Sequence, residues 1–199
     1  MADLDIAMLG ITQAEGGWSS DVDDAGGETI FGIARNFFPD WPGWTLVDQR
    51  KTKKEKEALL TVPAMYGMVM DFYRIHFWNR LRGDAIHDSL QDIAGELMDV
   101  GVNAGVHTAV TFLQRAMNVL NRNETGIMKY NDLLVDGVLG NVTLETLNSY
   151  RYRGVDEVAL LYKVMNILQG MKYIESMEKN HRQEKYARGW FGRVAIAKG

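Results

Sequence analysis

Residues 13–33 read QAEGGWSSDVDDAGGETIFGI and interrupt what is otherwise a helical start to the chain. Apolar side chains over residues 4–14 recur at close to a helical period. The two glycines that follow favour a helix end, because glycine adopts the left-handed conformation at little steric cost. We therefore expect a helix over residues 4–14 with Glu15 on its last turn, followed by a polar, glycine-rich loop over residues 16–28.

The remaining chain predicts further helices and no strand pattern of any length. The expected helices cover about residues 29–37, 53–60, 63–78, 89–103, 106–120 and 155–180, with one more opening near Thr143, which we expect to cap it. The predicted fold class is all-α. A small hairpin within residues 16–30 is left open as an alternative.

Length and composition bound the class of protein. A chain of 199 residues with 46% hydrophobic and 24% charged residues can form one large domain or two small lobes with a proper core. Its net charge of -4 argues against a dedicated nucleic-acid binder. Residues 172–199 are locally cationic, which predicts either a solvated helix face or a weak contact with an anionic envelope surface.

The start of the chain, MADLDIAMLG, carries acids where a secretory signal needs positive charge. We therefore expect synthesis in the bacterial cytoplasm without a signal peptide. The chain has no cysteine, which excludes thiolate catalysis, thiolate metal sites and disulfides.

The segment DVDDAGGE (21–28) has closely spaced aspartates before a glycine, so we first compare it with a calcium-binding loop. Asp21, Asp23 and Gly26 fit its first, third and sixth positions, but Ala25 and Gly32 stand where oxygen ligands belong. The four histidines show no metal-ligand spacing either. We expect no metal and no cofactor.

Paired carboxylates are the chemistry that remains. Hydrolysis of a glycosidic bond needs one acid that stays protonated near neutrality and a second group that is ionised. Glu15, at a helix end near Trp18, is placed for a raised pKa, whereas Asp21 and Asp24 in an open loop are placed to stay ionised. The alternative is structural: the aspartates cap turns, and Glu15 is a surface residue.

The pattern E-G-G-W-x-x-D-x-D-D-x-G-G-E-T-x-x-G-I resembles the signature of glycoside hydrolase family 108, a family of phage and prophage muramidases. Trp18 stands where the family usually has tyrosine, and Ala25 stands where proline is common. The matching residues are Glu15, Gly16, Gly17, Asp21, Asp24, Gly26, Gly27, Thr29, Gly32 and Ile33.

The resemblance extends over nearly the whole chain. NAGVHTAVTFLQRAMN (103–118), VDGVLGNVTLETL (135–147) and RGWFGRV (188–194) are similar to the second half of that family, a helical peptidoglycan-binding module. The resemblance implies a lysozyme-like fold with a catalytic lobe over residues 1–88 and a helical peptidoglycan-binding lobe over residues 89–199.

The implied activity is that of an N-acetylmuramidase that cleaves the β-1,4 bond between N-acetylmuramic acid and N-acetylglucosamine. Glu15, Asp24 and Thr29 also follow nearly the spacing seen in phage-type lysozymes. By that likeness Glu15 is the general acid, Asp24 steers water or stabilises the cation, and Thr29 positions the water. Asp21 is the rival for the role of Asp24.

The substrate contacts and partners are expectations of the same kind. Aromatic faces commonly support sugar rings, so Trp18, Trp41 and Trp44 are candidates, together with Phe37 and Phe38. In the second lobe the resemblance adds Asp136, against the structural alternative of a tight turn. We expect a monomeric endolysin that acts on the cell wall after release by a holin. The alternatives are a lytic transglycosylase and a non-catalytic wall-binding or secretion-assisting protein.

Overall fold

The computed structural model describes residues 1–14, 17–20 and 26–195. It is 64% helical with one small sheet, which confirms the all-α class. The strands are β1 (Trp18–Ser20), β2 (Glu28–Ile30) and β3 (Ile33–Ala34). The helices are α1 (Leu4–Ala14), α2 (Trp44–Asp48), α3 (Lys53–Glu57), α4 (Pro63–Tyr73), α5 (Gln91–Ala104), α6 (Val106–Val119), α7 (Asn141–Ser149), α8 (Val155–Lys179) and α9 (Ala187–Phe191).

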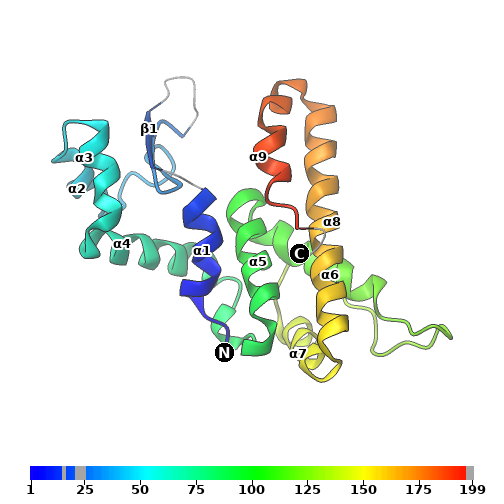
Figure 1. Ribbon diagram of the computed structural model, residues 1–199. Coiled ribbons are helices and arrows are strands. Elements are labelled where there is room, and N and C mark those ends of the chain that lie inside the picture. Colours follow the sequence, from blue (N-terminus) through cyan, green and yellow to red (C-terminus); the bar gives the residue numbers. More distant parts are fainter. Residues whose placement is uncertain (15–16, 21–25, 196–199) are drawn as a thin grey trace.

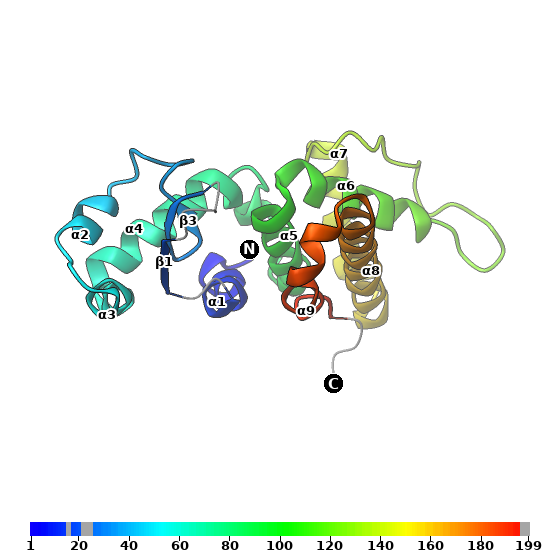
Figure 2. The same cartoon turned by 90° about the horizontal axis from the view of Figure 1, so that it is seen from above.

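Helix α1 lies between two groups of elements. The sheet and helices α2–α4 lie on one side of it, and helices α5–α9 lie on the other, as both views show (Figures 1 and 2). The backbone amide of Ala2 donates to the carbonyl of Ile86 at 2.7 Å, and Asp3 exchanges two backbone hydrogen bonds with the side chain of Gln91. The first helix is therefore fastened to the start of α5 and joins the two groups.

The expected helix over residues 29–37 is wrong, because a three-stranded antiparallel sheet in the order β1-β2-β3 takes its place. Trp18 pairs with Ile30, Ser20 pairs with Glu28, and Ile30 pairs with Ile33. The two residues between β2 and β3, Phe31 and Gly32, have φ of 52° and 76°. Positive φ at both central residues is the requirement of the tight turn that suits a two-residue hairpin.

Tertiary contacts hold Phe31 in this uncommon conformation. Its side chain is 4% exposed, and its carbonyl accepts a hydrogen bond of 2.8 Å from the hydroxyl of Tyr73 in α4. The neighbouring Ile30 and Ile33 are fully buried. Burial of three apolar side chains therefore outweighs the preference of this segment for a helix.

Most of the other expected helices are confirmed. Thr52 and Glu55 form a capping box at the start of α3, and the helix that begins at Pro63 continues through a π-helical turn over Arg74–Trp78. Helix α7 begins at Asn141 with Gly140 as its N-cap, so the expected cap at Thr143 is wrong. No helix among the described residues is both long and apolar enough to cross a membrane.

Candidate functional site

The structure places one of the four predicted catalytic residues. Glu15, Asp21 and Asp24 lie outside the described residues, so their roles stay predictions. Glu15 follows α1 directly in the sequence, and the two aspartates fall between β1 and β2. Thr29 lies on β2 opposite Ser19, and its hydroxyl is 3.4 Å from the carbonyl oxygen of Gly27.

The best-defined polar group beside these positions is a cluster around Glu28, which consists of Trp18, Glu28, Arg35 and Lys56. The Trp18 indole Nε1 donates to Glu28 Oε1 at 2.6 Å, and Lys56 Nζ donates to the same oxygen at 2.7 Å. Arg35 Nε donates to Glu28 Oε2 at 2.8 Å. The Glu28 cluster therefore joins β1, β2 and α3, and it supports the two strands that flank residues 21–25.

The electrostatics of the cluster keep Glu28 ionised. Burial alone would raise its pKa, but the hydrogen bonds from Lys56 and Trp18 and the charges of Arg35 and Lys56 lower it below its usual value. Arg35 in turn has a raised pKa, because Asp48 accepts its hydrogen bonds. A carboxylate held by two cations is a poor general acid, so Glu28 is a supporting residue of the hairpin rather than a rival for Glu15.

Three tryptophans were predicted to support sugar rings, and they occupy different environments. Trp18 is half-buried, and one ring face carries the ammonium of Lys56 at 4.4 Å from the ring centroid. Trp41 and Trp44 are 7% and 3% exposed, and their indole nitrogens donate to the carbonyls of Met68 and Phe38. The rings of Trp41 and Trp44 therefore pack the interior of this half of the chain.

Trp41 also lines a cavity of about 490 Å³ against α4. Phe37, 64% exposed, forms part of its rim, and Phe72 and His76 line it from α4. At this cavity the exposed aromatic ring that could stack on a sugar is therefore that of Phe37, because Trp41 and Trp44 are buried.

In the second half of the chain, Asp136 belongs to a turn that a buried glutamine holds. The side chain of Gln114, 1% exposed, donates to Asp136 Oδ1 at 2.8 Å and to the hydroxyl of Thr143 at 3.2 Å. Its Oε1 accepts from the amide of Gly137, which has φ of 67°. The hydrogen bonds from Gln114 and the Val138 amide lower the pKa of Asp136. This carboxylate is exposed and ionised, with one oxygen engaged in the turn.

Gln114 is the first of three amide side chains on one face of α6 and its C-terminal end, which we call the α6 amide ladder. Asn118 donates to the carbonyl of Leu133 and accepts from its amide, both at 2.8 Å. Asn121 donates to the carbonyl of Tyr130 and accepts from its amide. The ladder thus fixes the irregular chain between α6 and α7 through its backbone.

Two acidic residues are missed by reasoning from sequence, Glu28 and Glu96. Glu28 lies inside the opening stretch, but its partner Lys56 is distant in sequence. Glu96 is 5% exposed on α5, and its neighbours Ile93, Leu97 and Val100 are fully buried. A lone glutamate on the apolar face of a predicted helix is the signal that marks it. Within the described residues no three acids or histidines converge so as to hold a metal ion.

Comparison with known proteins gives two family matches that divide the chain. Residues 8–105 match the model described as Glycosyl hydrolase 108, and residues 108–195 match the model described as Predicted Peptidoglycan domain. The two matches meet between α5 and α6, whereas the lobe boundary predicted from the sequence falls at residue 88. No curated protein matches the chain.

Among solved structures, the chain is similar to SagA of Brucella abortus. The two are 21% identical with a TM-score of 0.54, and the match covers 96% of this chain and 88% of that one. At this identity the likeness concerns the fold alone. The two family matches together extend from residue 8 to residue 195 and support conclusions about function as well. The chain has a predicted peptidoglycan domain in its second half and is a glycoside hydrolase that acts on peptidoglycan. It belongs to glycosyl hydrolase family 108.

Proposed function

We propose that the protein is an N-acetylmuramidase that hydrolyses the β-1,4 bond between N-acetylmuramic acid and N-acetylglucosamine. Glu15 is the general acid that protonates the leaving oxygen. Asp24, with Asp21 as its rival, activates water or stabilises the developing cation, and Thr29 positions that water. The observation that supports the proposal most strongly is the family match over residues 8–105, a range that includes the positions of all four residues.

The described geometry supports this assignment of roles. Helix α1 ends at Ala14, so Glu15 follows a segment of fixed direction. The Glu28 cluster holds β1 and β2 on either side of the segment that contains both aspartates. Rigid support on each side of the predicted carboxylates is what a general acid and an ionised partner need in order to keep a fixed separation.

The decisive experiment is clearing of purified sacculi by the wild type and by Glu15→Gln. Loss of a general acid reduces the rate by at least about 100-fold. Glu145→Gln is the matched control, because it makes the same change at an exposed position on α7. Equal clearing by the wild type and Glu15→Gln would remove Glu15 from its role, and clearing by neither would favour a non-catalytic wall-binding protein.

Asp24→Asn and Asp21→Asn identify the second carboxylate. The variant with the larger loss of rate, at unchanged binding to sacculi, marks the residue that acts on water or on the cation. Equal and small losses in both variants would assign the aspartates to the loop structure alone.

The rival reaction is that of a lytic transglycosylase, which also relies on one glutamate but closes an anhydro ring. Mass spectrometry of the released muropeptides separates the two. We expect reducing ends, and a majority of anhydro ends would overturn the hydrolase assignment.

The proposed biological role is that of an endolysin whose access to the cell wall depends on a holin. Expression in a bacterial host with and without a holin tests it. Lysis is expected only when both are present, and equal lysis in the two cultures would contradict the dependence.

A further inference from the structure

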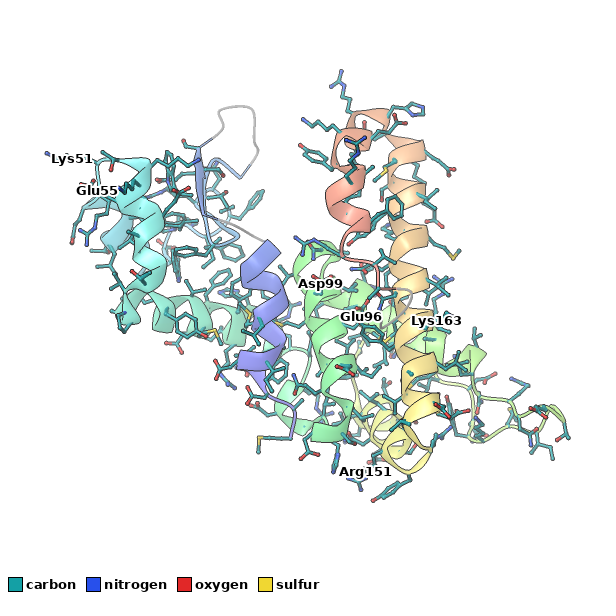
Figure 3. All side chains as sticks on the ribbon, in the orientation of Figure 1. Lys51, Glu55, Glu96, Asp99, Arg151 and Lys163 are labelled. Atoms are coloured by element: carbon teal, nitrogen blue, oxygen red, sulfur yellow. The ribbon has the colours of Figure 1, made fainter. Side chains whose placement is uncertain are left out.

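A second cavity, which has several charged residues in its lining, lies between helices of the two halves of the chain. It has a volume of about 370 Å³ and is lined by Ala7 of α1, by acids of α5, by Tyr162 of α8 and by Arg193 after α9. Figure 3 shows two of its acidic residues, Glu96 and Asp99, between α5 and α8. Thr29, which is the one proposed catalytic residue that the structure describes, is not among the described residues that line it.

Glu96 is the feature of this cavity that the fold does not explain. Its side chain is 5% exposed, and its carboxyl oxygen Oε1 is buried without a hydrogen-bond partner. A buried polar atom that stays unpaired costs about 1–3 kcal/mol. Burial and the neighbouring charge of Asp99 raise the pKa of Glu96 to about 8, although a hydrogen bond with Asn166 opposes this change. At neutral pH the folded protein therefore keeps a protonated carboxyl here.

The surroundings of Glu96 are rich in acceptors. Asp92, Glu96 and Asp99 are spaced so that they share one face of α5, where like charges four residues apart repel each other. Asp99 accepts from Arg193 Nη1 at 3.0 Å and from Gln169 Nε2 at 2.8 Å. The remaining amide oxygen of Gln169 is also buried without a partner. The Glu96 oxygen is an acceptor once the carboxyl is ionised, so a cationic ligand that donates hydrogen bonds would satisfy it.

From these observations we propose that the cavity binds a primary ammonium group, with Glu96 as its carboxylate partner. An ammonium offers three donors in a compact volume, which suits the unpaired oxygen of Glu96 beside the carboxylate of Asp99. A metal ion fits less well, because no three acids or histidines of the described residues converge to ligate one. The positive charge of the ligand would offset the repulsion that Asp92 and Asp99 exert on Glu96 once Glu96 is ionised.

The source of the ammonium rests on the proposed function. Peptide stems of peptidoglycan contain a diamino acid whose side-chain amine is free until a cross-link converts it into an amide. A site for this amine would make the protein prefer glycan whose stems are not cross-linked. The cavity lies between the half that matches a glycosyl hydrolase and the half that matches a peptidoglycan domain, so a stem bound there would be in contact with both.

Calorimetric titration of the full chain with two synthetic peptides tests the site directly. The probes are the N-acetylated stem tripeptide acetyl-L-Ala-γ-D-Glu-L-Lys, whose one amine is on the lysine side chain, and the same peptide with that amine also acetylated. Charge-assisted hydrogen bonds contribute enough to predict about tenfold or tighter binding of the free amine. Equal affinity for the two peptides in the wild type would overturn the proposal without recourse to any variant.

Variants assign the effect to Glu96. Glu96→Gln, a neutral isostere of the protonated side chain, should bind both peptides equally, whereas the exposed control Glu145→Gln should keep the preference. Discrimination that survives in Glu96→Gln would refute the role of this residue. Glu15→Gln should lose clearing of sacculi and still discriminate between the peptides, so the two proposals can fail separately.

Proton release gives a readout that a purely structural role would not produce. Among the described residues that line the cavity, the titratable and charged groups around Glu96 are Asp92 and Asp99 on α5, Tyr162 on α8 and Arg193 after α9. The described lining residues of α1 are apolar. Binding of a cation favours the ionised carboxylate, so Glu96 should release its proton on binding at pH 7 and less of it at pH 9. Titrations in buffers of different ionisation enthalpy measure this release, and none at pH 7 would contradict the proposal.

Discussion

The Glu28 cluster and the α6 amide ladder hold irregular segments in place with different chemistry. The first uses a carboxylate, two cations and an indole to fix short strands in the glycosyl hydrolase half. The second uses neutral amides to fix a long loop in the peptidoglycan-domain half. Interactions between partly buried charges depend on pH and salt, whereas amide hydrogen bonds depend on neither to the same degree. The two halves should therefore respond differently to the same perturbation.

The largest effect on stability is expected from Gln114→Ala. The substitution removes one buried amide with four hydrogen bonds and leaves the partners of the turn unpaired, which predicts a loss of about 3 kcal/mol in the free energy of unfolding. Urea denaturation measures it. Gln49→Ala, at an exposed position in the other half, is the matched control. A similar loss in both variants would mean that the hydrogen bonds of Gln114 do not stabilise the fold.

A smaller loss, about 2 kcal/mol, is expected from Glu28→Gln, because Arg35 and Lys56 lose the carboxylate that neutralises both of them. Amide hydrogen exchange should quicken in β1 and β2 and stay unchanged in α6. Glu57→Gln is the control, since its exposed pair with Lys53 spans 3.6 Å and contributes less than about 0.5 kcal/mol. Uniform loss of protection along the chain would mean that the cluster does not act locally.

The third effect concerns pH and separates the two chemistries. The folded state lowers the pKa of Glu28, so the stability contributed by its charge is present above the pKa of the unfolded chain. It is lost as the pH falls through the folded pKa. The difference in stability between the wild type and Glu28→Gln should therefore shrink in acid. The difference between the wild type and Asn118→Ala should not, because Asn118 binds only the backbone of Leu133. Parallel changes in both differences would refute the contrast.

The parts of the fold that could be predicted are those with local signals. The capping box of Thr52 and Glu55 and the apolar period after Pro63 depend on neighbours within a few residues. The sheet could not be predicted in the same way, because its strands are two or three residues long, too short for an alternating pattern to show. The turn at Phe31 also depends on Tyr73, a contact that no local pattern contains.

The site shows the same division. The family resemblance of the acid-rich motif could be recognised in the sequence, and the family match confirms the family, whereas the roles of the individual acids stay predictions. The burial and the hydrogen-bond partners of each side chain could not be predicted from the sequence. Trp41 and Trp44 are aromatic residues of the kind that stack on sugar rings. In the structure both rings are buried, and their indole nitrogens donate to the carbonyls of Met68 and Phe38. In the sequence nothing distinguishes Glu28 from the neighbouring acids, because its partner Lys56 is brought beside it only by the fold.

The α6 amide ladder has a consequence for how such proteins diversify. Most of its hydrogen bonds are with peptide groups of the loop, although Gln114 and Asn121 also donate to the carboxylates of Asp136 and Asp132. The apolar side chains of the loop take no part in these hydrogen bonds. Ile127, Leu134 and Val138 are accordingly 66%, 77% and 59% exposed. We therefore expect substitutions at these exposed positions to change the surface chemistry of the loop while its backbone keeps its path.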